Sequence, residues 1–353
     1  MSESKRVFAL LSDARLRQRI RRQWRSNGIT LCGVHAEGGE ALVGELARLR
    51  PHVVIADADA DGVREIVQAA SQRYRIPVIG VVRAQQSGLA ALLPLEWGAV
   101  TLVPCANQDT EQVLEELETA VEAACGVQVV ELLESTFPLS GAFPNAAVFD
   151  LRRALQALEP REKVVVIGGG LGGPMGVRRI LAGVRDQVVS PIVCVQRFAE
   201  PLFDVLLRWL EKHTGAQVVR AEDGQRLDVG CVYVASSARD AVKVILREGG
   251  PVLQVSASKE PGRFDALLES AAEVYGSRAV GVLLSDHGSD GSEGLLKLRK
   301  AGGFTIVQDR ASSLVYDLPG RARDAGGAIE CLPINEIAER IHMLMRPEHA
   351  ARS

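Results

Sequence analysis

Short apolar runs recur along the chain at the spacing of alternating strands and helices. In the first 105 residues they read RVFALL, ITLCGV, HVVIAD, PVIGVV and AVTLVP, separated by helix-like stretches such as ARLRQRIRRQWRS. Parallel strands need crossover connections of about this length. The pattern therefore predicts a doubly wound α/β domain over residues 1–125.

A second series of apolar runs begins at Val164. It reads VVVIGG, PIVCVQ, AQVVRA, CVYVAS, VKVIL, PVLQVSA, AVGVLLS and FTIVQD, and predicts another α/β domain over residues 161–348. Residues 126–160 between the two series combine turn residues with weak periodicity, which is typical of a linker. At 353 residues the chain is long enough for two separate cores.

Composition excludes several classes of function. Charged residues make up 24% of the chain and the net charge is -3, so there is no bulk attraction to nucleic acid or to a membrane surface. No apolar run approaches the length of a membrane-spanning helix. The six cysteines are scattered singly without CxxC pairs, which favours buried thiols in a reducing cytoplasm over a metal site. We expect a cytoplasmic protein that holds no metal.

A glycine-rich turn follows the first strand of the second domain, in VVVIGGGLGGPMGVRRIL. Gly168, Gly170 and Gly173 complete a GxGxxG pattern, but a dinucleotide site also needs an acidic residue at the end of the next strand. That strand ends at Gln196 and Arg197. The arginine leaves an NADP site open as an alternative, whereas our prediction is that the chain binds no cofactor.

Together with its neighbours, this turn resembles the chemotaxis response-regulator methylesterases, the protein-glutamate methylesterases that demethylate receptors. IGGGLGG resembles that family's I-G-A-S-T-G-G, and YVASSARD resembles its Y-I-A-P-G-x-x-H. LLSDHGSDGSEG and the later QDRASSLVYDLP resemble L-T-G-M-G-x-D-G-x-x-G and Q-x-x-x-S-x-V-x-x-M-P. The resemblance implies a flavodoxin-like receiver domain, a linker and a methylesterase-like domain.

The resemblance also implies a catalytic triad of serine, histidine and aspartate. The aspartate is retained as Asp290, whereas the serine position is Gly170 and the histidine position is Arg197. Glycine has no nucleophile, and an arginine stays protonated and cannot act as a base. The enzyme assignment is therefore uncertain, and our prediction is an inactive site.

A relocated triad is the alternative. His287 stands at the family's methionine position beside three serines, Ser285, Ser289 and Ser292. Such residues within one loop rarely have the opposed geometry that a triad needs. The alternative function is a residual or relocated protein-glutamate methylesterase or glutamine deamidase acting on receptors.

The first domain has lost receiver residues in the same way. The phospho-acceptor position is retained as Asp57, but the acid pair is displaced, with Asp13 one place late. Four positions that bind the metal or steady the phosphoryl charge are changed, to Leu11, Ser12, Val82 and Cys105. Phosphoryl transfer to a carboxylate needs such cations. We expect Asp57 not to be stably phosphorylated; weak cation binding by Asp57, Asp59 and Asp61 is the alternative.

These losses predict a catalytically inactive binding or regulatory homologue in a chemosensory or type IV pilus pathway, with chemoreceptor-like or other signalling proteins as partners. A purely structural assembly module is a further hypothesis. The resemblance implies a groove for a receptor helix, and we expect Arg197 and Arg239 to make it favour acidic side chains. We also expect Arg197 to hydrogen bond with Asp290.

Overall fold

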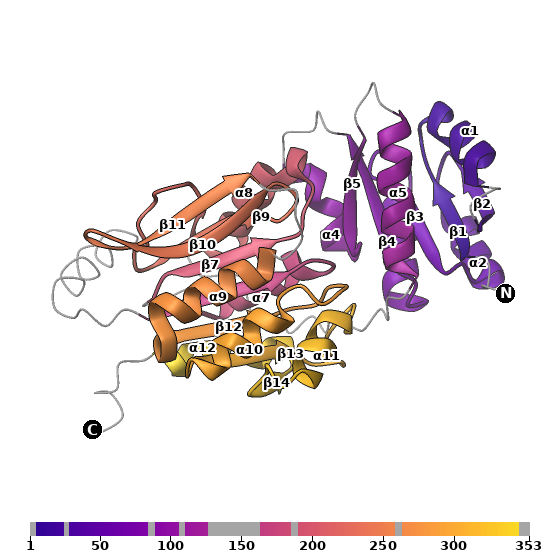
Figure 1. Cartoon of the computed structure of the whole chain (residues 1–353). Coiled ribbons are helices and arrows are strands. Elements are labelled where there is room, and N and C mark those ends of the chain that lie inside the picture. Colours follow the sequence, from indigo (N-terminus) through magenta and orange to yellow (C-terminus); the bar gives the residue numbers. More distant parts are fainter. Residues whose placement is uncertain are drawn as a thin grey trace.

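The computed structural model describes residues 5–24, 28–83, 89–105, 110–125, 163–184, 190–257 and 263–345. Figure 1 shows two parallel sheets, each covered by helices on both faces, one formed by residues before and one by residues after the predicted linker in the sequence. The predicted linker lies outside the described residues. The boundaries proposed for the two domains stay a prediction, while the α/β fold class is confirmed.

The first sheet has the strand order β2-β1-β3-β4-β5, which is the flavodoxin-like order of a receiver. Each strand coincides with one of the five predicted apolar runs. The strands are β1 (Lys5–Leu10), β2 (Ile29–His35), β3 (Val53–Asp57), β4 (Val78–Arg83) and β5 (Thr101–Cys105).

Helices cover both faces of this sheet because each has one apolar side. One face carries α1 (Ala14–Gln23) and α5 (Thr110–Ala124), and the other carries α2 (Glu40–Leu49) and α3 (Val63–Gln68), which continues into a π-helical turn at Ala69–Arg73. A 3-10 helix (Leu89–Leu92) leads into α4 (Leu93–Trp97). Asp13 begins α1, since its carboxylate accepts the N–H groups of Arg15 and Leu16 at 2.7 and 3.0 Å.

The second sheet has seven parallel strands in the order β14-β13-β12-β6-β7-β9-β8. All but the short edge strand β14 coincide with predicted runs. The strands are β6 (Val164–Gly169), β7 (Ile192–Gln196), β8 (Gln217–Arg220), β9 (Cys231–Ser236), β12 (Ala279–Leu283), β13 (Phe304–Gln308) and β14 (Glu330–Leu332).

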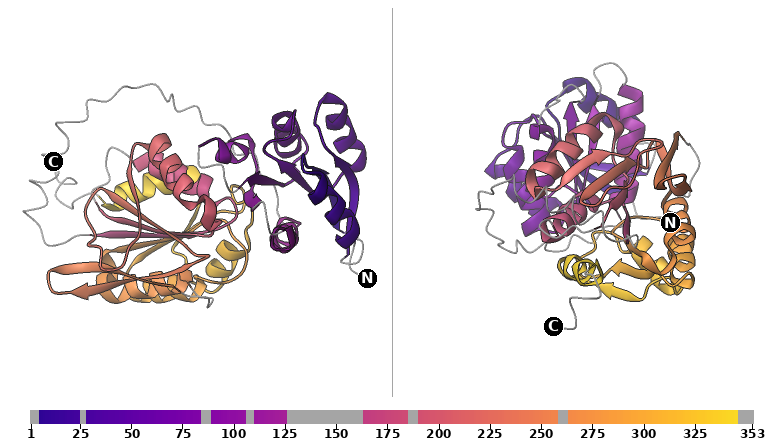
Figure 2. Two further views of the ribbon diagram at one scale, coloured as in Figure 1. Left: turned by 90° about the horizontal axis from the view of Figure 1, so that it is seen from above. Right: turned by 90° about the vertical axis from the view of Figure 1, so that its left-hand side faces the viewer.

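Helices of the described residues pack on both faces of this sheet, and Figure 2 shows the two helical layers from above. One face carries α7 (Gly173–Val184), α8 (Phe203–Thr214) and α12 (Ile334–Met345), and the other carries α9 (Arg263–Tyr275), α10 (Ser292–Lys300) and α11 (Asp317–Asp324). Short 3-10 helices at Glu200–Leu202 and Gly276–Arg278 precede α8 and β12.

Two of the predicted runs do not join the second sheet. They form β10 (Asp240–Arg247) and β11 (Gly250–Ala257), which pair with each other as a separate two-stranded antiparallel sheet. The apolar runs alone could not reveal this, because both strands keep the same alternating pattern as a half-buried parallel strand.

The two domains share an apolar interface. Leu92 and Leu95, from the 3-10 helix and α4, belong to the same buried cluster as Leu206 and Trp209 of α8. The Trp209 indole Nε1 donates to the Glu96 carboxylate at 2.8 Å. In Figure 1, α4 lies on the side of the first sheet that faces the second domain. The receiver-like domain therefore packs against the second domain through a continuous core.

Among the helices that the structure describes, none is long and apolar enough to cross a membrane. The sequence analysis expected the cysteine thiols to be buried, and this is confirmed for only some of them. Cys194 and Cys231 are buried, whereas Cys331 on the edge strand β14 is exposed.

Candidate functional site

The glycine-rich turn connects β6 to α7, and the protein's own side chains pack against it. The Gln196 side-chain amide donates to the carbonyls of Gly169 and Gly170 at 2.9 and 3.2 Å. A Cβ added at Gly173 would collide with this amide, and one at Gly172, whose φ is +77°, would collide with Leu314. The glycines therefore accommodate the side chains of Gln196 and Leu314, which pack directly against the turn.

Asp286 fills the place of a side chain at residue 170. A Cβ added at Gly170 would overlap all three atoms of the Asp286 carboxyl group, closer than any real Cβ contact. The carboxyl is held there by the Leu171 N–H, at 3.3 Å from Oδ1, and its side chain is 1% exposed. Neither serine nor any other residue with a Cβ fits at position 170 while Asp286 stays in place.

Arg197 completes this arrangement. Its Nε donates to Asp286 Oδ2 at 3.0 Å, while about half of its side chain faces solvent. The guanidinium also lies 5.9 Å from the centre of the Phe264 ring. The buried carboxylate is thus neutralised by a cation at its open side, which is the usual condition for burying such a charge. Positions 170, 197 and 286 form one packed unit, the Gly170–Arg197–Asp286 unit.

The predicted bond between Arg197 and Asp290 is wrong. Asp290 begins helix α9 instead: its carboxylate accepts the backbone N–H groups of Arg263, Phe264 and Asp265 at 3.0 to 3.1 Å. With three donors at a helix N-terminus, Asp290 is already satisfied. The arginine pairs instead with Asp286, the aspartate four residues earlier, at 3.0 Å.

The sequence itself indicates that Asp286 takes the space of a side chain at residue 170. The indication is missed when each motif position is compared separately. LLSDHGSDG places Asp286 at the first glycine of the family's L-T-G-M-G, while the family's serine has become Gly170. A glycine thus replaces a side chain at one position, and a side chain replaces a glycine at the other. Such a reciprocal change is the signal of two positions that share one volume.

The residues proposed for a relocated triad do not come together. His287 Nε2 donates to the carbonyl of Ala123 at the end of α5, and its Nδ1 lies 4.0 Å from Asp317 Oδ2. The Ser285 hydroxyl is buried and accepts the Val315 N–H at 2.8 Å. His287 is therefore occupied with a contact between the domains rather than with a serine hydroxyl. Of the other two serines, Ser292 is buried at the start of α10 and Ser289 is exposed.

Charged side chains surround Asp317, the carboxylate next to His287. Burial raises the pKa of Asp317, but the Gly288 N–H and the Arg321 guanidinium, at 2.9 and 2.7 Å, outweigh it and hold the pKa below its ordinary value. Asp317 therefore stays ionised and behaves as an ion-pair partner rather than as a general acid.

Arg197 and Arg239 do not form the free cationic groove that the sequence predicted. Arg239 lies 3.4 Å from a Glu200 oxygen and 3.6 Å from an Asp240 oxygen, and Arg197 is paired with Asp286. Both guanidinium groups are already balanced by carboxylates of this chain. An acidic helix would have to displace those carboxylates before it gained an ion pair.

In the first domain, Asp57 lies at the end of β3 and is held by its neighbours. Its Oδ2 accepts both the hydroxyl and, at 3.0 Å, the backbone N–H of Ser12, and its Oδ1 accepts the Asp59 N–H at 3.1 Å. Ser12 is the position that the sequence resemblance assigned to a metal-binding acid, and here its hydroxyl donates to Asp57 instead. Asp57 is only 5% exposed.

The other altered receiver positions are apolar or uncharged. Val82 is fully buried. Burial, followed by the charges of Asp13 and Asp57, raises the pKa of the Cys105 thiol, so Cys105 stays an uncharged thiol. Asp59 pairs with Arg83 at 2.8 Å. Within the described ranges, no three carboxylate, imidazole or thiol groups meet as metal ligands.

Comparison with known proteins places these observations in one family. The profile described as CheB methylesterase matches residues 165–341. The protein-glutamate methylesterase/protein-glutamine glutaminase 4 of Geobacter metallireducens is 31% identical over 90% of this chain and 92% of its own. A second protein of that name from Anaeromyxobacter dehalogenans is 32% identical over 90% of each chain.

A solved structure gives a further likeness. The CheB methylesterase catalytic domain of Thermotoga maritima is 29% identical, with a TM-score of 0.49, over 52% of this chain and 98% of that domain. The family resemblance seen in the sequence is confirmed: this chain belongs to the CheB methylesterase family.

Proposed function

We propose that this chain is a non-hydrolytic regulatory member of its family, which acts by binding rather than by cleaving esters. The observation that carries the proposal is the Gly170–Arg197–Asp286 unit. A carboxylate that is 1% exposed and tied to a guanidinium occupies the space that a nucleophile at residue 170 would need. The proposed domains are a pseudo-receiver over residues 1–125 and a pseudo-methylesterase over residues 161–348.

The chemistry of ester hydrolysis supports this proposal. The reaction needs a hydroxyl to attack the carbonyl, a neutral base to take its proton and donors for the oxyanion that forms. At this site the hydroxyl and the base are replaced by Gly170 and Arg197. The Asp286 carboxylate accepts the Leu171 N–H, and its negative charge would repel a developing oxyanion.

We infer a place in chemosensory signalling from the relatives. Their names give activity on protein glutamate and glutamine side chains. Chemoreceptor-like proteins, or signalling proteins of a chemosensory or type IV pilus pathway, are the proposed partners, and the cytoplasm is the proposed location. Loss of the receiver cations around Asp57 supports a partner role that does not depend on phosphorylation.

The test of inactivity uses the full chain and membranes that carry methyl-esterified chemoreceptors. Mass spectrometry would follow glutamyl methyl esters and glutamines at the receptor sites, with the Geobacter metallireducens relative as the active control. We expect the receptor's methyl esters and glutamines to be lost no faster in the presence of this chain than in buffer alone. Turnover by the unmodified chain would overturn the proposal, and its loss in Asp286→Ala would then point to a relocated active site.

A second experiment identifies the partner. Co-purification of the tagged full chain from its native host is expected to recover receptor or signalling proteins. Recovery of structural assembly proteins alone would support the module hypothesis instead.

A variant with the family residues restored, Gly170→Ser with Arg197→His and Asp286→Gly, should bring back measurable ester cleavage because it removes the overlap at residue 170 and supplies both missing groups.

A further inference from the structure

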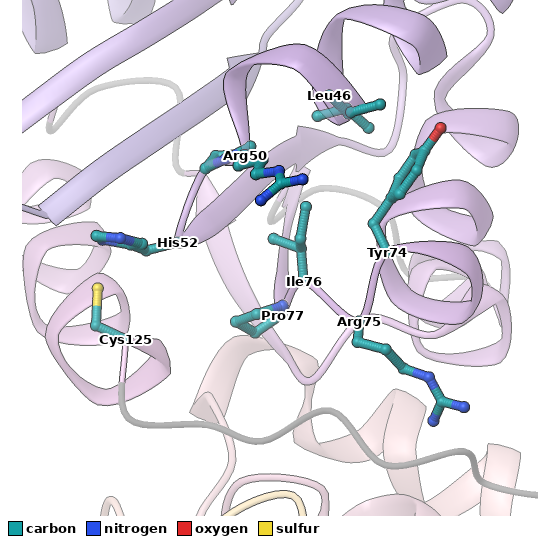
Figure 3. Close-up of a pocket in the computed structure, with 10 residues that line it drawn as sticks. Leu46, Arg50, His52, Tyr74, Arg75, Ile76, Pro77 and Cys125 are labelled. Carbon is teal, nitrogen blue, oxygen red and sulfur yellow. The ribbon is translucent and has the colours of Figure 1, made fainter.

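A cavity of about 500 Å³ opens on the first domain, away from both degenerate sites. Its walls come from the end of α2, the start of β3, the π-helical turn before β4, and the end of α5 (Figure 3). Pro51 and Pro77 precede β3 and β4, so the cavity lies at the amino-terminal edge of the sheet. Asp57 ends β3 at the opposite edge. The cavity is therefore distinct from the phospho-acceptor position.

Every charged side chain that lines this cavity is basic or carries an imidazole. Arg50, His52 and Arg75 line it and no carboxylate does. The floor between them is apolar, with Leu46 and Ile76 buried. In Figure 3 the Arg50 guanidinium reaches over Ile76 towards the middle of the cavity, whereas the side chains of His52 and Arg75 point away from it. A cation above an apolar floor suits an organic anion.

The donors in the cavity are set by the backbone around them. The Nδ1 atom of His52 accepts the Arg6 N–H at 3.2 Å, so the neutral imidazole carries its hydrogen on Nε2 and offers it as a donor. The Arg50 carbonyl accepts a guanidinium N–H of Arg6 at 2.7 Å, which fixes the backbone of Arg50. No side chain in the described part of the chain pairs with the Arg50 guanidinium.

The backbone of Arg50 is strained. In the described ranges, the non-glycine residues with a positive φ are Arg50 at 44° and Arg75 at 58°, and both line this cavity. Arg50 follows the last residue of α2, where its N–H donates to the Leu46 carbonyl and where glycine is the favoured residue. Strain of this kind tends to persist where the side chain has a use.

We propose that this cavity binds a small organic anion, a phosphate monoester or carboxylate with an apolar body. The anionic head pairs with the Arg50 guanidinium, and the body lies on Leu46 and Ile76. Cys125 lines the same cavity two residues after Ala123, whose carbonyl accepts the His287 hydrogen bond from the second domain. An occupant would thus lie beside a contact between the domains and give the chain an input that needs no phosphoryl group on Asp57.

The test is titration calorimetry of the full chain with phenyl phosphate, benzoate, inorganic phosphate and phenol. We expect saturable binding of phenyl phosphate or benzoate, with the tighter of the two identifying the head group. Inorganic phosphate and phenol should bind at least about tenfold more weakly, since each lacks one half of the ligand. Equal binding of inorganic phosphate, or no saturable binding of any probe at millimolar concentration, would overturn the proposal.

The decisive variant is Arg50→Gly, because glycine relieves the positive φ while removing the guanidinium. We expect phenyl phosphate or benzoate to bind at least about tenfold more weakly, with an unchanged or higher urea midpoint. Arg48→Ala is the matched control: Arg48 is an exposed arginine of the same helix that pairs with Glu45 and does not line the cavity. If Arg50→Gly binds the ligand as tightly as the unmodified protein, or if Arg48→Ala loses as much affinity as Arg50→Gly, the binding does not depend on this cavity and the proposal is overturned.

Cysteine labelling gives an independent readout in the unmodified protein. Bound phenyl phosphate or benzoate should slow alkylation of Cys125, which lines the cavity, and leave the exposed Cys331 unchanged. Equal protection of the two thiols, or no protection at saturating ligand, would place the ligand elsewhere.

Discussion

Restoring a serine at residue 170 alone is expected to destabilise the protein, although this position holds the nucleophile in the family. The new Cβ would overlap the Asp286 carboxyl group and push it from its place. Overpacking of a filled interior costs about 1–3 kcal/mol. The displaced carboxylate also loses the Leu171 N–H and the Arg197 guanidinium. Because Arg197 is 53% exposed and partly solvated in either case, we add only about 1 kcal/mol for that loss. The expected total for Gly170→Ser is roughly 2–4 kcal/mol.

The same packing predicts a rescue. Asp286→Gly alone should cost about 1–2 kcal/mol, since it removes the ion pair but leaves Arg197 free to face water. In the double variant the overlap no longer exists, so its loss of stability should be smaller than the sum of the two single losses by about 2 kcal/mol.

Urea unfolding of the full chain, followed by tryptophan fluorescence, measures this coupling. Gly44→Ser is the control, because a Cβ at Gly44 in α2 meets nothing within 4 Å. It should leave the midpoint nearly unchanged. If the stability lost in the double variant equals the sum of the losses in Gly170→Ser and Asp286→Gly within about 0.5 kcal/mol, the interpretation that the two positions share one volume is refuted. A Gly170→Ser loss no larger than that of the control would also refute it.

Three further outcomes are expected. Incubation with acetyl phosphate and Mg²⁺ should leave the intact mass of the protein unchanged, because Asp57 is 5% exposed and its oxygens are hydrogen bonded; a stable gain of one phosphate would contradict this. Alkylation near pH 8 should modify the exposed Cys331 first and reach Cys194 only after unfolding, since burial raises the pKa of Cys194 to about 12; early labelling of Cys194 by peptide mapping would show that β7 is not buried. Leu92→Asp places a charge in the apolar interface and should lower the free energy of unfolding by more than about 2 kcal/mol and increase the radius of gyration in solution scattering; an unchanged radius would mean that the interface tolerates the charge.

The amino-acid sequence was sufficient to predict most of the strands and the family. Apolar alternation marks a strand wherever one or both faces are buried, so the pattern of apolar runs alone located β1 to β5 and most of the second sheet. It could not separate the β10–β11 hairpin from the parallel strands. Pairing partners depend on which edges meet in space, and this information is not contained in a single strand.

The site was predicted only in part for a related reason. Alignment with the family motif located Gly170, Arg197 and Asp290, but it also carried over the family's pairing of the last two. Motif alignment does not show which other groups the aspartate binds. Here three backbone N–H groups of α9 occupy Asp290, and the new carboxylate at Asp286 takes the arginine. The spatial role of the retained aspartate therefore changed while its place in the motif did not.

The buried cluster shared by the two domains has a mechanical consequence. Val82, at the former switch position of β4, belongs to the same cluster as Leu206 of α8. Interiors packed at this density are nearly incompressible, so we expect a shift of Val82 to be passed on to neighbouring side chains of this cluster. The shared core thus offers a packed path along which a change in the first domain can reach α8 while the two domains stay in contact.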